Sequence, residues 1–161
     1  LIEGGRPEYH SYGTFTAPGN SSTLVHVYDS VWLDDEALNV RYTGGQPWAY
    51  FYVQYGSPDI RVVRIATDYS AYDRLRLELK RDAGTQCSAL RLEIKDIDGA
   101  EKGGLRNVPL VLTPEWQTYT VDLAEFADAD LTRLSIVAGF LFESPQPCSI
   151  AIRDVRYLRP E

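Results

Sequence analysis

The 161-residue chain has the length of one domain, and its composition, 44% hydrophobic and 12% aromatic, is typical of a folded protein. No apolar run approaches the ~18 residues that a membrane span needs, so we expect no membrane insertion. Sixteen basic and twenty-three acidic residues give a net charge of −7, which disfavours nucleic acids and anionic lipid surfaces as partners.

The chain contains no methionine and opens without a signal-peptide pattern. We therefore expect an excised module or a processed chain.

Short β-branched and aromatic runs, separated by Gly, Pro, Asn and Asp, dominate the pattern. Residues 1–12 predict an extended lead-in, and residues 13–161 predict one domain. In several of these runs apolar and polar residues alternate, which predicts a strand with one face buried in the core. Residues 123–132 predict a connection with one short helical turn. The expected fold is all-β, a two-sheet antiparallel β-sandwich. Its predicted strands are 13–17, 24–29, 37–42, 49–55, 60–65, 74–80, 89–96, 108–112, 117–122, 134–142 and 149–158.

The segment 48–55 carries the strongest functional signal, because alternation along a strand sorts it into two chemically different faces. Apolar residues take one face and can fill a core. The other face holds three amphipathic rings and an amide, and such a row facing water is typical of a surface that stacks on sugar rings. Its burial under a loop is the alternative. The predicted platform is Trp48, Tyr50, Tyr52 and Gln54.

One predicted strand and one predicted loop carry further candidate ligand-binding residues. Arg91 and Glu93, on the solvent face of strand 89–96, would provide directional hydrogen bonds if that strand adjoins the aromatic one. Trp32 lies in a predicted loop, where it either caps a binding groove or pins the loop. Trp116, at the start of a strand, is expected to pack structurally.

Cys87 and Cys148 each stand just ahead of a predicted strand, 61 positions apart. A disulfide between them would contribute about 4 kcal/mol in the chain-entropy model, and two buried thiols are the alternative. Neither cysteine has a CxxC or His context, so no zinc site is expected.

Catalytic patterns are weak, so we expect no enzyme. The two histidines, His10 and His26, have no neighbouring nucleophile motif. Acidic pairs such as Asp96 and Asp98 are local to turns, whereas the two carboxylates of a glycosidase usually face each other across a cleft.

Several segments resemble, in order and spacing, the non-catalytic carbohydrate-binding modules of the galactose-binding-like β-jelly-roll type. The likeness covers residues 13–158. It rests on YD at 28–29, EALNVRY at 36–42, WAYFY at 48–52, YDRLRLELK at 72–80, TPEWQTYTVDL at 113–123, LTRL at 131–134 and IAIRDVRY at 150–157.

The resemblance implies a module that binds a polysaccharide on a concave aromatic face and targets an attached glycoside hydrolase or lyase. It also implies one structural calcium. Such modules often carry Ile-Asp-Asp in the last strand, but here Arg153 replaces the first Asp, so Asp154 with Asp29 or an early backbone carbonyl would be the remaining ligands. Pairing of Asp154 with Arg156 or Arg153 at the surface is the alternative.

The resulting expectation is a secreted or cell-surface monomer that binds a β-glucan-like or related plant or algal glycan and breaks no bond. One alternative is a jelly-roll polysaccharide lyase or hydrolase. Another is a protein-interaction or assembly module on the same fold.

Overall fold

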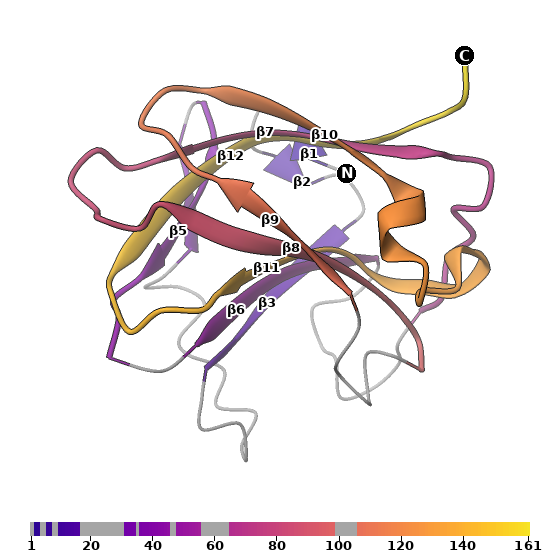
Figure 1. Cartoon of the computed structure of the whole chain (residues 1–161), viewed down its shortest axis with the longest axis horizontal. Helices are drawn as coiled ribbons and strands as arrows, with labels where there is room; N and C mark the ends of the chain where they lie inside the picture. The colour runs from indigo at the N-terminus through magenta and orange to yellow at the C-terminus, as the bar shows by residue number, and fades with distance from the viewer. Residues whose placement is uncertain are drawn as a thin grey trace.

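The computed structural model describes residues 2–3, 6–7, 10–16, 31–34, 36–45, 48–55, 65–98 and 106–161. These residues form two antiparallel sheets that pack face to face as a β-sandwich (Figure 1). The all-β, two-sheet prediction is confirmed.

Seven of the described strands form sheet A, in which β12 is the central strand. It pairs with β7 on one side, and on the other with β5 near its start and with β1 further along. Strand β10 pairs with β7, β4 with β5, and β2 with β1. The strands are β1 (Ile2–Glu3), β2 (Arg6–Pro7), β4 (Val31–Leu33), β5 (Leu38–Tyr42), β7 (Arg74–Arg81), β10 (Gln117–Asp122) and β12 (Cys148–Leu158).

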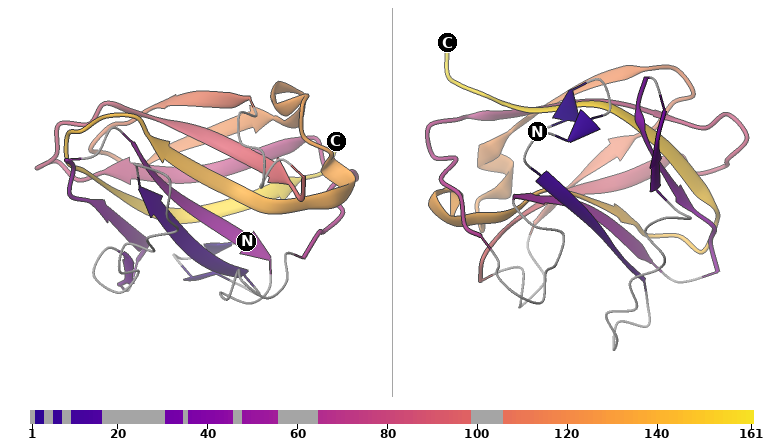
Figure 2. Two further views of the ribbon diagram at one scale, coloured as in Figure 1. Left: turned by 90° about the horizontal axis from the view of Figure 1, so that it is seen from below. Right: turned by 180° about the vertical axis from the view of Figure 1, so that it is seen from behind.

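Five described strands form sheet B, in the order β3-β6-β11-β8-β9. Figure 2 shows this sheet from below and from behind, with β3 beside β6. The strands are β3 (His10–Thr16), β6 (Ala49–Tyr55), β8 (Ala89–Asp96), β9 (Asn107–Val111) and β11 (Leu134–Phe142).

One core fills the space between the sheets. Leu75, Leu77 and Leu79 of β7 are fully buried, and on sheet B the rings of Phe51 and Phe140 stack with centroids 5.9 Å apart. Burial of a large apolar side chain is worth about 1.5–3 kcal/mol, so period-2 alternation fixes which face of each strand points inward.

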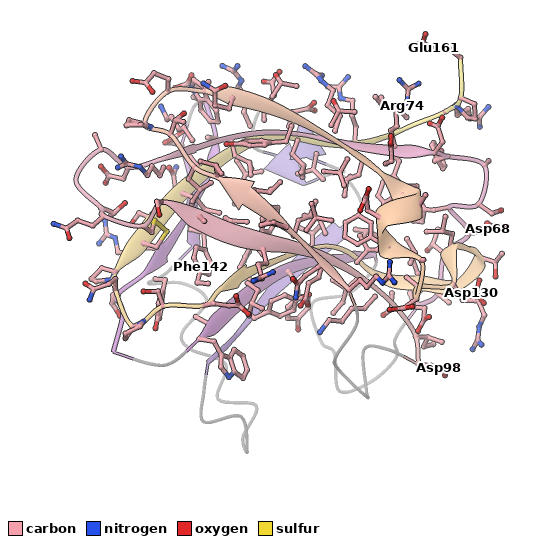
Figure 3. The ribbon with its side chains drawn as sticks, in the orientation of Figure 1. Asp68, Arg74, Asp98, Asp130, Phe142 and Glu161 are labelled. Atoms are coloured by element: carbon pink, nitrogen blue, oxygen red, sulfur yellow. A yellow bond between two sulfur atoms is a disulfide. The ribbon has the colours of Figure 1, made fainter. Side chains whose placement is uncertain are left out.

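The two ends of the sandwich differ. At one end lie the short 3₁₀ helices η1 (Leu123–Phe126) and η2 (Leu131–Arg133), near Asp98 and Asp130 in Figure 3. At the other end, a disulfide joins Cys87 to Cys148 and links the lead into β8 to the start of β12. Of the two possibilities that the sequence leaves open, the structure therefore has the disulfide and not two buried thiols.

The structure differs from the predicted elements mainly at the N-terminus. The predicted lead-in contains β1 and β2, which add to sheet A beside β12, and β3 begins at His10. Backbone pairing outweighs the lack of an apolar period there, since short strands are stabilised by ladder hydrogen bonds. The predicted strand 24–29 and most of 60–65 lie outside the described residues.

No helix in the described part of the chain has the length and apolar character that crossing a membrane requires.

Candidate functional site

The outer face of sheet B brings the predicted platform and its predicted polar partners together. Strand β11 lies between β6 and β8, so its residues pair on both sides. Gly139 is in register with Tyr52 on one side and Glu93 on the other. Leu141 is likewise in register with Tyr50 and Arg91. The sequence could not establish that only one strand separates these two groups.

Tyr50 and Tyr52 are buried, not exposed as the sequence pattern predicted. They are 6% and 2% accessible, and their rings stack with centroids 5.7 Å apart. With Ile136, they form a small apolar cluster outside the main core, against which Trp48 and Leu141 pack. Of the three rings of the predicted platform, Trp48 is partly exposed and the other two are buried.

Gly139 explains how the Tyr50 ring can lie flat against the sheet. A Cβ atom at position 139 would be 1.8 Å from the Tyr50 hydroxyl oxygen, so the ring crosses β11 at the one position without a side chain. Glycine in a strand often marks such a close approach. The absence of a Cβ here makes room for the Tyr50 ring.

The phenol of Tyr50 lies in an unusual environment. Burial raises its pKa well above the ordinary value of 10.0, and the negative charge of Glu93 adds to the shift. Its hydroxyl makes no hydrogen bond of standard geometry within the described part of the chain. The ammonium of Lys95 lies 4.9 Å from the ring centroid, a cation–π contact.

A chain of polar contacts runs across the same face. Lys95 Nζ lies 3.2 Å from a carboxylate oxygen of Glu93, and Asn107 Nδ2 donates to Glu93 at 3.5 Å. Arg91 Nη1 donates to Asn107 Oδ1 at 2.8 Å, and Arg91 Nε pairs with Glu143. The two ends of this chain of contacts differ in solvent exposure. The Arg91 and Glu143 side chains are 41% and 49% exposed, whereas that of Glu93 is 9% exposed.

A groove of about 320 Å³ lies at the accessible end of this chain, near the disulfide. This volume is at the lower end of the roughly 300–1,000 Å³ range of small-molecule sites. Trp48 directly precedes Ala49, which pairs with Phe142, and Glu143 directly follows Phe142. Because the two strands are antiparallel, Trp48 and Glu143 lie at the same end of sheet B. The groove is lined by Gln86, Cys87, Ser88, Ala89, Leu90, Arg91, Pro109, Leu141, Glu143, Ser144 and Gln146.

Two of the predicted ligand-binding residues are placed by backbone register alone. Gln54, near the end of β6, pairs with Ile136 of β11 and with Ser11 of β3. Trp32 lies in β4 opposite Asn39, in sheet A. Trp32 is therefore not part of the sheet B face, because its strand pairs with β5.

The sequence pattern does not single out Asn107 or Gly139. Asn107 matters because it opens β9 opposite Glu93, and a register of this kind is not encoded in any local pattern. The pairing of strands distant in sequence is what reveals it.

Asp154 does not have the surroundings of a calcium ligand. It is 4% exposed, and its carboxylate is paired with Arg76 at 3.1 Å and Arg156 at 2.7 Å. Calcium binding needs six to eight oxygen ligands, and two guanidinium groups oppose a cation. Within the described ranges no three His, Cys, Asp or Glu residues gather as a metal site. Asp29, the other expected ligand, lies outside the described residues.

The turn carboxylates have structural partners. Asp34 accepts hydrogen bonds from the backbone N–H groups of Glu36 and Ala37, which lowers its pKa. Asp130 accepts from Thr132, and its own N–H donates to Asp96. These contacts fit turn and helix-cap roles.

No protein-family model and no curated protein match the chain. Solved structures do match it over nearly its whole length. The family 30 carbohydrate-binding module of the cellulosomal cellulase Cel9D-Cel44B from Clostridium thermocellum superposes with a TM-score of 0.66 at 13% identity, covering 99% of this chain and 96% of that one. A mutant of the family 29 module CBM29-2 gives 0.61 at 13% identity, covering 96% and 84%.

Part of an enzyme chain also matches. An exo-1,3/1,4-beta-glucanase from a Pseudoalteromonas species gives a TM-score of 0.62 at 15% identity. The match covers the whole of this chain but only 20% of the glucanase. At these identities the likeness establishes the fold and not the function. The chain has the β-jelly-roll fold of carbohydrate-binding modules.

Proposed function

We propose that this chain is a non-catalytic carbohydrate-binding module that binds a polysaccharide on the outer face of sheet B. The observation that carries the proposal is the register across β11, which puts the rings of β6 and the charged side chains of β8 on one face. Sugar recognition needs both, because rings stack on C–H faces while charged and amide groups bond to hydroxyls.

The burial of Tyr50 and Tyr52 assigns different roles to the residues of this face. The two tyrosines form a rigid base, held by Gly139 and by the contact of Lys95. Trp48, Arg91 and Glu143 are the accessible groups. We propose that Trp48 stacks on a sugar ring and that Arg91 and Glu143 bond to hydroxyls in the adjoining groove.

Neutral glycans fit this face better than charged ones. The cations Arg91 and Lys95 are matched there by the carboxylates of Glu93 and Glu143. A β-glucan-like polysaccharide offers hydroxyls that both donate to carboxylates and accept from the guanidinium. We therefore propose a neutral plant or algal glucan as the ligand, with micromolar to millimolar affinity, since few contacts are made.

The proposal includes where the module is located and what it is attached to. A disulfide is typical of an oxidising compartment, which supports a secreted or cell-surface location. Strands β1 and β12, near the two chain ends, both belong to sheet A (Figure 1). A catalytic glycoside hydrolase or lyase attached there would leave sheet B open to the polymer, and the module would act as a monomer.

The test is affinity electrophoresis of the purified chain through gels that contain soluble neutral glucans. Retention on at least one glucan is expected, and Arg91→Ala should reduce it about tenfold through a lost charge-assisted contact. Arg106→Ala, which removes an exposed cation paired with Asp128, is the matched control. Absence of retention across mixed-linkage, β-1,3 and β-1,4 glucans would contradict the proposal.

A further inference from the structure

The outer face of sheet A carries a second groove, of about 350 Å³, that the proposed function does not use. It lies over the start of β12, between β5 and β7. The residues that line it are Asn39, Arg41, Lys80, Arg81, Asp82, Ala83, Pro114, Ser149, Ile150 and Ala151. We refer to it as the basic groove.

Strand register explains why the sheet is hollowed here. On β12, Ser149 pairs with Arg41, and Ala151 pairs with Asn39 on one side and Lys80 on the other. Small side chains thus form the floor, while longer ones rise from the flanking strands. Because neighbouring strands are about 4.8 Å apart, the walls stand roughly 10 Å from each other.

The charge of the groove is opposite to that of the chain. Three of its residues are cationic, Arg41, Lys80 and Arg81, and one is acidic, Asp82. The Asp82 carboxylate accepts from the backbone N–H of Gly84 at 2.8 Å. At physiological salt, screening acts over about 8 Å, so these local cations outweigh the net charge of −7 for a ligand inside the groove.

Lys80 is held in position without a carboxylate at ion-pair distance among the described residues. Its ammonium lies 4.6 Å from the centroid of the Trp116 ring, and Arg153 lies 4.5 Å from the same ring. The Trp116 indole donates to Glu36 at 3.1 Å. A cation–π contact leaves ammonium donors available for a ligand. The partly buried Trp116 ring thus contacts the groove through Lys80.

Arg81 is fixed by the turn that follows β7. Its guanidinium donates to the carbonyl oxygens of Thr85 at 2.7 Å and Asp82 at 3.3 Å. Its Nε is buried and has no hydrogen-bond partner in the described part of the chain. Arg81 therefore contributes fixed positive charge beside the two walls that Arg41 and Lys80 form.

We propose that the basic groove is a second ligand site, which binds the carboxylate or sulfate group of an acidic saccharide. Cations on two walls, amide and hydroxyl groups on Asn39 and Ser149, and the adjacent Trp116 ring match such a unit. That the anion is borne by a saccharide rests on the proposed function. The site lies on the opposite sheet from the proposed glucan face, so one module would engage two different polymers.

The experiment is isothermal titration of the whole chain with two probes, an oligogalacturonate and a sulfated oligosaccharide, at roughly physiological salt. Arg41→Ala and Lys80→Ala should each weaken binding on the order of tenfold. Ser149→Leu should abolish it by filling the groove while keeping every charge. Arg133→Ala, which removes an exposed cation at the far end of the sandwich, should leave binding unchanged. Melting temperatures exclude variants that fail to fold.

The outcomes separate the two proposals. Binding of one probe alone identifies the anionic group. If neither probe binds, or if Arg133→Ala weakens binding as much as Lys80→Ala, the basic groove is not a site. The inference would also be overturned if Trp48→Ala lost binding of the acidic probe while Arg41→Ala, Lys80→Ala and Ser149→Leu still bound it. The acidic ligand would then bind sheet B. If the acidic probe binds and neutral glucans do not, only the proposed function is rejected.

Discussion

Gly139 lies directly beneath Tyr50, and a Cβ at position 139 would be 1.8 Å from the Tyr50 hydroxyl oxygen and 2.5 Å from the adjoining ring carbon. One glycine on β11 thus allows an aromatic residue of β6 to reach toward Glu93 on β8. This contact is the structural basis of the candidate binding face.

Gly139→Ala should displace the Tyr50 ring and destabilise the protein by about 1–3 kcal/mol, as overpacking of a close contact usually does. Denaturant unfolding measures the change. Gly84→Ala is the control, because a Cβ there meets only Asp82, at 3.4 Å. Equal stability of the two variants would mean that Tyr50 does not lie across β11.

Removing the Tyr50 hydroxyl should cost little. It is buried without a hydrogen bond of standard geometry, so Tyr50→Phe should change the unfolding free energy by less than about 1 kcal/mol. Tyr157→Phe is the matched comparison, since that buried hydroxyl donates to the carbonyl of Val137 at 2.8 Å. Its loss should cost about 1–3 kcal/mol, because the carbonyl is left unpaired. A larger loss of stability in Tyr50→Phe than in Tyr157→Phe would show that the Tyr50 hydroxyl is hydrogen-bonded to Glu93.

Reduction of the disulfide should lower stability by about 4 kcal/mol in the chain-entropy model, given its 61-residue separation. Melting in the presence and absence of dithiothreitol measures this loss. A Cys87→Ser/Cys148→Ser variant should melt near the reduced protein and show no response to the reductant. A wild type that melts at the same temperature with and without reductant would be inconsistent with a stabilising bond.

Glu78 should make stability depend on acid pH. The hydrogen bond from Arg153, at 2.8 Å, lowers the pKa of Glu78 below its ordinary 4.5. A depressed folded-state pKa stabilises the protein above the unfolded pKa, and that gain is lost as pH falls through the folded value. The stability advantage of wild type over Glu78→Gln should therefore shrink as pH falls from neutral to below 4.5.

The matched control is Glu161→Gln, whose side chain is 93% exposed. Its difference from wild type should stay small across the same range, since solvent screens exposed pairs. A pH-independent difference for Glu78→Gln would reject the role of the Arg153 pair.

Several features of this molecule were predictable from sequence because they depend on local alternation. The strands at 49–55, 89–96, 117–122 and 134–142 have the predicted bounds, since each follows the alternation of its apolar side chains. The inward set of β6, including Phe51 and Val53, was assigned on the same grounds.

The features that sequence could not supply depend on pairing between distant strands. The predicted exposure of Tyr50 and Tyr52 is wrong, because Gly139, far along the chain on β11, makes room for the Tyr50 ring, on which the Tyr52 ring stacks. Trp32 was grouped with Trp48, yet its strand belongs to sheet A. Asp154 is an expected metal ligand in the sequence, yet its carboxylate pairs with Arg76 of the neighbouring strand β7. None of these long-range partners is near its counterpart in sequence.

The central claim, that sheet B is the sugar-binding face, is tested most directly by comparing two tryptophans on opposite sheets. Retention on the neutral glucan that the wild type binds best is measured for Trp48→Ala and Trp116→Ala, with melting temperatures as the check on folding. Trp48→Ala should lose retention, and Trp116→Ala should keep it. Retention by Trp48→Ala together with loss in Trp116→Ala would contradict the account and place the glucan on sheet A.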